Sequence, residues 1–236
     1  MKKKSVAGLL GLIFFGCIND PQPNKTLTLN FPLSVGKIWE YESVWSLNDS
    51  TIDSTTQWTS ITSKETDSLG FAIYEFKDSA DGNISYDYYQ KRNDGIYIYA
   101  STPGGLYVLW KSKSLQPGTT LNSSPVLLAP SIFNFGNEWI YDTLIDSVSQ
   151  TRKPLRRSCQ GRQQVITKAG TFDCYKFETS GYMNEKRYHY YSPSIGLVMK
   201  EEVIDSFGVS SVDPVTAALN IQFKTSVRRS SLVSTN

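Results

Sequence analysis

Histidine and cysteine are scarce in this chain, whose 236 residues include one histidine and three cysteines. So few imidazole and thiol groups exclude a cysteine-based metal site and leave little material for any other metal centre. Charged residues make up only 19% of the chain, too few for a disordered protein or a coiled coil. The formal net charge of +2 gives no electrostatic reason to expect nucleic-acid binding. We therefore expect no metal, no cofactor and no nucleic acid.

Aromatic residues are abundant, with 14 tyrosines and 11 phenylalanines, and they favour β structure. Turn formers such as Asp81-Gly82 and Asn93-Asp94-Gly95 divide the chain into short segments without helical periodicity. The exception is 213–219, where Asp and Pro would begin a short helical turn. The expected strands span 36–46, 51–63, 70–78, 84–92, 95–101, 105–111, 138–149, 157–168, 171–180, 185–191, 196–204 and 219–227. The prediction is an all-β fold whose sheet is curved and mainly antiparallel, as a half-barrel or as two related β-meanders.

The first seventeen residues have the features of an export signal. Three lysines at positions 2–4 precede an apolar run from Val6 to Phe15, which is too short for a bilayer that needs about 20 residues. The run ends in Gly16-Cys17 and resembles the bacterial lipoprotein signal, which implies cleavage before Cys17 and a diacylglycerol on its sulfur. Phe14 stands where that signal usually has leucine, so an ordinary secretory signal with an incidental cysteine is the alternative.

The domain organisation follows from this signal. We expect a signal peptide over 1–16, a lipidated Cys17 with a flexible tether over 17–30, and one β-rich domain over 31–236, or two lobes dividing near 112–130. Loss of three of the 24 basic side chains with the signal leaves 21 against 22 acidic ones, a net charge of −1. Attachment to a membrane would therefore come from the lipid. Ile18 is not the aspartate that retains some lipoproteins at the inner membrane, which favours the outer membrane of a bacterial envelope.

A short internal repeat accompanies this organisation. The pattern Gly-x-x-Trp-x-Tyr occurs at residues 36–41 and again at 136–141. Its tryptophan and tyrosine, two residues apart, would share one face of a strand. Two such starts predict two β-meanders, joined in one long curved sheet or separated into two lobes.

Three longer motifs resemble a family of exported bacterial proteins with a TapB-like domain of unknown function. They are Phe-Pro-Leu-x-Val-Gly-x-x-Trp-x-Tyr at 31–41, the run 165–178 with Ala-Gly-Thr-Phe-Asp-Cys-Tyr-Lys-Phe-Glu, and Tyr-Tyr-Ser-Pro-x-Ile-Gly-Leu-Val at 190–198. The resemblance covers most of residues 31–205 at the level of these motifs, and the chain from Ser206 onward departs from it. It implies a curved antiparallel sheet on an exported or lipid-anchored protein, and no established activity. Similar half-barrels occur in carriers of the LolA/LolB type, which hold acyl chains, although that is a fold analogy.

Cys159 and Cys174 are the two cysteines left if Cys17 is acylated, and an oxidising envelope permits a disulfide between them. A tight turn at Ala169-Gly170 would place Cys174 opposite Val165, so that the pair could meet only through a bulge or across another strand. The sequence therefore neither predicts nor excludes this disulfide.

Catalytic motifs are absent from the sequence. There is no Gly-x-Ser-x-Gly elbow, phosphate loop or zinc-protease motif. His189 alternates within a predicted strand, where a satisfied or solvent-facing histidine is more common than a catalytic one. The pairs Glu40/Glu42 and Glu201/Glu202 are interpreted as solvated rim positions. We expect a protein that is not an enzyme.

Two sets of residues are candidates for binding or modification. An aromatic patch able to stack on sugars or bind a protein would comprise Tyr86, Tyr88, Tyr97, Tyr99, Tyr107 and Trp110, although tyrosine is also a common half-buried strand residue. The pattern Asp-Ser/Thr followed by a small or aliphatic residue or threonine resembles acceptor sites of a bacterial O-glycosylation system, at Ser50, Ser54, Ser68, Ser79, Thr143 and Ser147.

The predicted function is binding or scaffolding by a lipid-anchored envelope protein. A carrier holding an acyl chain or other apolar ligand in the concave face of the sheet is the alternative, and a hydrolase is the third. The scaffold predicts a filled concavity, whereas the carrier predicts an open apolar cavity. The sequence identifies neither the partner, whether envelope protein, glycan or lipid, nor the oligomeric state.

Overall fold

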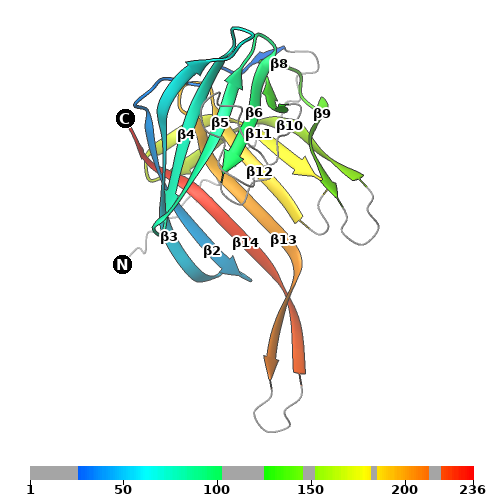
Figure 1. Ribbon diagram of the computed structural model, residues 1–236. Coiled ribbons are helices and arrows are strands. Elements are labelled where there is room, and N and C mark those ends of the chain that lie inside the picture. Colours follow the sequence, from blue (N-terminus) through cyan, green and yellow to red (C-terminus); the bar gives the residue numbers. More distant parts are fainter. Residues whose placement is uncertain (1–25, 103–124, 146–151, 182–184, 213–218) are drawn as a thin grey trace, which may run out of the picture.

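The computed structural model describes residues 26–102, 125–145, 152–181, 185–212 and 219–236 (Figure 1). All regular secondary structure in these ranges is β-strand, which confirms the all-β prediction. The strand expected at 105–111 lies outside the described residues. So does the helical turn expected at 213–219, except for Leu219, which already begins a strand.

Two consecutive antiparallel meanders form a single sheet of twelve strands in the described chain. The strands of the first are β2 (Ile38–Leu47), β3 (Ser50–Thr66), β4 (Ala72–Ala80), β5 (Asn83–Lys91), β6 (Gly95–Thr102) and β7 (Val126–Pro130). Those of the second are β9 (Glu138–Ile145), β10 (Arg152–Thr167), β11 (Gly170–Ser180), β12 (Glu185–Ser192), β13 (Gly196–Val212) and β14 (Leu219–Thr235). The strand order is β7-β6-β5-β4-β3-β2-β14-β13-β12-β11-β10-β9, so the meanders join where β2 pairs with β14. The curved antiparallel sheet predicted from the sequence is confirmed.

The internal repeat marks the same place in each meander. Gly36 and Gly136 occupy left-handed conformations, with φ of 89° and 80°, at the turns before β2 and β9. The N–H of Gly36 donates to the carbonyl of Ile61, and that of Gly136 to the carbonyl of Cys159, both at 2.9 Å. Each glycine thus turns the chain into the first strand and ties it to the second strand of its own meander.

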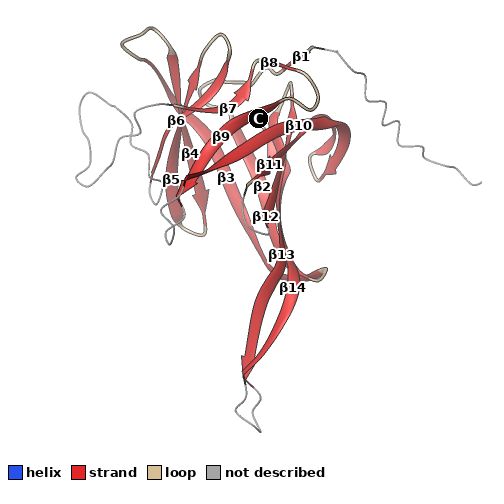
Figure 2. Ribbon diagram, turned by 90° about the vertical axis from the view of Figure 1, so that its right-hand side faces the viewer, coloured by secondary structure: helices blue, strands red, loops and turns tan. Residues whose placement is uncertain are grey.

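The sheet curls until its two edge strands, β7 and β9, lie side by side (Figure 2). The indole N–H of Trp139 on β9 donates to the carbonyl of Leu127 on β7 at 3.2 Å. The guanidinium of Arg157 on β10 donates to the carbonyl of Leu128 at the same distance. These two side chains reach across the junction and hold the sheet in its curved form.

A hydrophobic plug fills the end of the curved sheet where β1 (Leu27–Thr28) pairs with β8 (Ile132–Phe133). The Phe133 ring lies 5.3 Å from the ring of Phe177. Leu27 and Leu29 are each only 4% exposed in the same cluster. Leu27 and Leu29 therefore belong to the folded body, although both fall within the expected tether 17–30.

The β13–β14 hairpin projects from the rest of the sheet (Figure 1). Strand β13 continues to Val212, beyond the end at residue 204 that the sequence predicted. The pairing with β14 shifts register between Ile204 and Phe207, and Ser206 there has a φ of 61°. A bulge of this kind bends and twists a hairpin, which accounts for the change of direction.

The possible disulfide is not formed, because Cys159 and Cys174 are free and buried. The β10–β11 turn closes between Thr167 and Gly170, one residue earlier than expected. Cys174 therefore lies opposite Gln163, and Cys159 lies opposite Phe177. The two thiols stand several residues apart along neighbouring strands, too far for a bond between sulfurs.

Both thiols should resist alkylation in the native protein. Burial raises the pKa of Cys159 to about 11 and that of Cys174 to about 12, so almost no thiolate exists at neutral pH. For residues 17–236 carrying Cys17→Ser, we expect no iodoacetamide adduct under native conditions and two adducts after denaturation without reductant. Intact mass measures both states. A denatured chain without adducts and lighter by two hydrogens would show a bridge instead.

The N-terminal packing has a measurable contribution to stability. Leu29→Ala removes a side chain from the plug and should lower the free energy of unfolding by about 2–4 kcal/mol. Leu69→Ala is the matched control because Leu69 is 75% exposed, and it should change that free energy by less than about 0.5 kcal/mol. Urea denaturation compares the two. Equal effects would mean that the plug adds nothing to folding.

Candidate functional site

The concave face of the sheet encloses a cavity of about 290 Å³. Aromatic side chains from both meanders make much of its wall, among them Trp39, Phe76, Tyr89, Tyr141 and Tyr191. Four ionisable side chains also line it: Asp78, Asp87, His189 and Lys200. The cavity therefore combines an apolar body with a few polar groups, as small-molecule sites do.

Strand register explains why these residues meet. Asp78 on β4 pairs with Thr59 on β3, and Asp87 on β5 pairs with Phe76 on β4. All four side chains lie on the concave face. On β12 and β13, His189 lies directly opposite Lys200. Because the sheet curls, the acidic strands of the first meander face the basic strands of the second across the cavity.

The acidic side consists of two half-buried carboxylates, Asp78 and Asp87. Asp78 accepts a hydrogen bond from the Thr59 hydroxyl, and Asp87 accepts one at 3.4 Å from the Tyr89 hydroxyl. Burial raises the pKa of Asp78, although the bond from Thr59 opposes the rise. Burial and the nearby charge of Asp78 raise the pKa of Asp87 to about 6. Within the described ranges, neither carboxylate has a basic side chain at ion-pair distance.

The basic side contributes little net positive charge, because Lys200 is paired with a glutamate and His189 is neutral. Lys200 pairs with Glu202 on the same strand, with 3.0 Å between Nζ and Oε1. Burial, followed by the charges of Arg157 and Lys200, holds the pKa of His189 well below its ordinary value, so this histidine is neutral at pH 7. Its ring stacks on Tyr191 at 6.2 Å, and its buried Nδ1 has no hydrogen-bond partner among the described residues.

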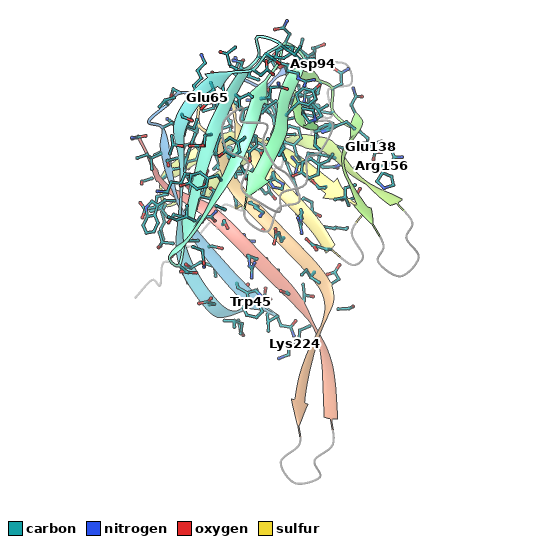
Figure 3. The ribbon with its side chains drawn as sticks, in the orientation of Figure 1. Trp45, Glu65, Asp94, Glu138, Arg156 and Lys224 are labelled. Atoms are coloured by element: carbon teal, nitrogen blue, oxygen red, sulfur yellow. The ribbon has the colours of Figure 1, made fainter. Side chains whose placement is uncertain are left out.

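Arg157 is the most unusual buried group near the cavity, with a side chain only 1% exposed. Its Nε donates to the Thr179 hydroxyl at 2.9 Å, and its guanidinium lies 3.7 Å from the centre of the Tyr141 ring. Nη2 has no partner in the described chain. The neighbouring Arg156 points outward, toward Glu138 at 3.7 Å (Figure 3). Because side chains alternate along β10, Arg156 pairs with the exposed carboxylate of Glu138, whereas Arg157 lies over the ring of Tyr141 on the inner side of the sheet.

His189 was interpreted from the sequence as an ordinary strand histidine, either satisfied or facing solvent. The structure corrects this, because the side chain lines the cavity and one ring nitrogen is buried without a partner. Of the two glutamate pairs, Glu40/Glu42 fits the rim interpretation, because Glu42 is 32% exposed and pairs with Lys168 at 2.8 Å. Glu201 and Glu202 do not fit it, because their side chains are only 16% and 18% exposed and pair with Arg229 and Lys200.

The residues of the predicted aromatic patch lie on the outer face of the sheet where they are described. Tyr86 and Tyr88 alternate with Asp87 on β5, and Tyr97 pairs with Gln90 across to β6. Tyr97 also donates to Asp94 at 2.8 Å. These three tyrosines therefore share one face, opposite to the cavity. The Tyr99 side chain, Tyr107 and Trp110 lie outside the described residues.

The predicted modification sites have different surroundings. Ser50, Ser54 and Ser68 are exposed, with Ser68 in the turn before β4. Ser79 is half-buried within β4, whereas an acceptor site of this kind needs an exposed turn. The Thr143 side chain, Ser147 and the lipidation site Cys17 lie outside the described residues. Glycosylation at these positions stays a prediction.

Neither a metal centre nor a membrane helix is found in the described part of the chain. No group of three or more histidine, cysteine, aspartate or glutamate side chains there could hold a metal ion. No helix among those residues is long and apolar enough to cross a membrane.

The fold and cavity define an all-β protein with a ligand-sized hollow inside one curved sheet. No family model matches the chain, and no curated protein does. Among solved structures, it is similar to a predicted lipoprotein of Parabacteroides distasonis, with 18% identity, 89% of this chain and 99% of the other covered, and a TM-score of 0.43. It is also similar to a predicted exported protein with a YmcC-like fold from Bacteroides fragilis, with 12% identity, coverage of 89% and 100%, and a TM-score of 0.41.

The buried carboxylate of Asp87 should reduce stability at neutral pH. Its pKa of about 6 in the folded protein lies above its value in the unfolded chain, so folding becomes less favourable as pH rises from about 4 to 6. Asp87→Asn should therefore raise the free energy of unfolding at pH 7 by about 1–3 kcal/mol and change it little near pH 4. Urea denaturation at both pH values checks this, and a loss of stability at pH 7 would contradict it.

Proposed function

We propose that this protein binds a small molecule at the bacterial cell envelope and performs no catalysis. The observation that carries the proposal is the cavity of about 290 Å³ inside the curved sheet. Its volume is near the lower end of the range for small-ligand sites, about 300–1,000 Å³, and its wall combines aromatic rings with a few ionisable groups. A scaffold predicts a filled concavity, so the open cavity favours ligand binding.

The proposed location rests on the sequence. The run of lysines, the short apolar segment and Gly16-Cys17 support export followed by lipidation of Cys17. The residue after Cys17 favours the outer membrane. The resemblance of residues 31–205 to the TapB-like family supports the same assignment. We therefore propose that the domain is anchored by its lipid through a short tether that ends before Leu27.

A carrier of purely apolar chains fits the cavity less well. An acyl chain inside it would leave Asp78 and Asp87 in contact with hydrocarbon, which is costly for ionised groups. The carrier alternative is therefore retained in a modified form, in which the ligand has a polar group as well as an apolar body.

A hydrolase is also less well supported, although His189 lies in the cavity. A catalytic histidine needs a nucleophile on one ring nitrogen and an orienting partner on the other. The Nδ1 atom of His189 has no partner among the described residues. We therefore assign the ionisable groups to binding.

The proposal is tested by native mass spectrometry of residues 17–236 carrying Cys17→Ser, produced in a periplasm. We expect the native mass to exceed the denatured mass by a discrete amount, equal to one retained ligand. Ile98→Trp places a larger side chain in the cavity wall and should abolish the excess. Ile84→Trp is the matched control, since Ile84 is 45% exposed on the outer face of β5, and it should keep the excess. Equal native and denatured masses in the unsubstituted chain would contradict the proposal.

A further inference from the structure

Among the residues that the structure describes, the two carboxylates of the cavity have no counter-charge of their own. Asp78 and Asp87 come from neighbouring strands, and the charge of one raises the pKa of the other. Lys200 attracts both, but its ammonium group already pairs with Glu202 at 3.0 Å. With His189 neutral, the cavity has an excess of negative charge at neutral pH.

The rings beside these carboxylates form a surface suited to a cation. Phe76 packs edge-on against Tyr89, with 4.5 Å between ring centres, and stacks on Trp39 at 6.0 Å. All three rings line the cavity on the side of Asp78 and Asp87. Aromatic faces attract cations through the quadrupole of the ring, most strongly where water is excluded. A carboxylate beside such rings adds a charge-assisted hydrogen bond to a protonated nitrogen.

We propose that the ligand of this cavity is a small organic ammonium compound, whose protonated nitrogen binds Asp78 and Asp87 while its apolar part lies against Trp39, Phe76 and Tyr89. This inference rests on the proposed function and names the ligand class of the same site. An anion or a neutral apolar molecule would leave the two carboxylates unpaired in a partly buried site.

Ionisation of Asp87 makes the proposed binding depend on pH. The charged and titratable groups that face this carboxylate are Asp78, Tyr89, Tyr41, Tyr141, His189, Tyr191 and Lys200. Burial raises the pKa of Tyr41, Tyr89 and Tyr191 and lowers that of His189, which moves both kinds of group away from ionisation at pH 7, so the two carboxylates carry the change. Because the pKa of Asp87 is about 6, its ionised fraction rises about tenfold from pH 5 to pH 7. Ammonium affinity should rise by a similar factor if only that form binds well.

The test compares three probes of the same size and different charge: benzylammonium, benzyl alcohol and benzoate. Each is titrated into residues 17–236 carrying Cys17→Ser, with binding measured by calorimetry and by tryptophan fluorescence, to which Trp39 in the wall contributes. At pH 7 we expect benzylammonium to bind at least about tenfold more tightly than either other probe. At pH 5 this preference should fall to about twofold.

Two substitutions locate the effect. Asp87→Asn keeps the shape of the side chain and should remove most of the preference for benzylammonium together with its pH dependence. Asp49→Asn makes the same chemical change in the exposed turn between β2 and β3, and should leave both unchanged. Equal losses in the two variants would mean that benzylammonium responds to overall charge, which overturns the inference.

The remaining outcomes separate this inference from the proposed function. Tighter binding of benzoate or benzyl alcohol overturns the ammonium assignment, and if Ile98→Trp abolishes that binding, small-molecule binding in the cavity still stands. Failure of all three probes also overturns the ammonium assignment. The proposed function fails with it only if the native and denatured masses of the unsubstituted chain are equal.

Discussion

The curvature of the sheet depends on the contact between its two edge strands, and the cavity depends on that curvature. Among the described residues, Trp139 on the edge strand β9 and Arg157 on the adjacent strand β10 both donate to backbone carbonyls of β7. These bonds give carbonyls of one edge strand donors from the other end of the sheet. Because the edges meet in this way, side chains of the concave face surround an interior volume instead of facing bulk water.

The interior that results is not built for stability alone. A fully apolar filling would avoid the cost of desolvating Asp78, Asp87 and Arg157. Arg157 repays part of its cost through bonds to Thr179 and Leu128 and through its position over the Tyr141 ring. Asp87 receives a single long bond from Tyr89. A buried acid with so little compensation is characteristic of sites where binding, rather than folding, sets the choice of residue.

The sequence predicted most of the strands, because turn formers and alternation are local signals. The repeat Gly-x-x-Trp-x-Tyr also indicated the two meanders correctly, since its glycines need the left-handed turn that precedes β2 and β9. Strand β7 was missed because Val126–Pro130 is short and bounded by Pro125 and Pro130, and proline argues against a strand. The cavity was missed for a different reason: Asp87 lies between tyrosines in the sequence, and only the curl of the sheet brings it toward His189 and Lys200. Contacts between distant strands have no signal in local pattern.

The two meanders share a frame but contribute different chemistry to the cavity. Each begins with a tryptophan and a tyrosine two residues apart, but Trp39, Tyr41 and Tyr141 line the cavity whereas Trp139 packs against the plug. In the first meander, the third and fourth strands, β4 and β5, carry Asp78 and Asp87. In the second meander, β11 and β12 pair Phe177 with His189, as β4 and β5 pair Phe76 with Asp87, and His189 lines the cavity. Both meanders thus contribute aromatic rings to the wall, while Asp87 and His189 at equivalent strands make one side acidic and the other nearly neutral. An oriented ligand with one charged end follows from that asymmetry, because a symmetric cavity would bind either end equally.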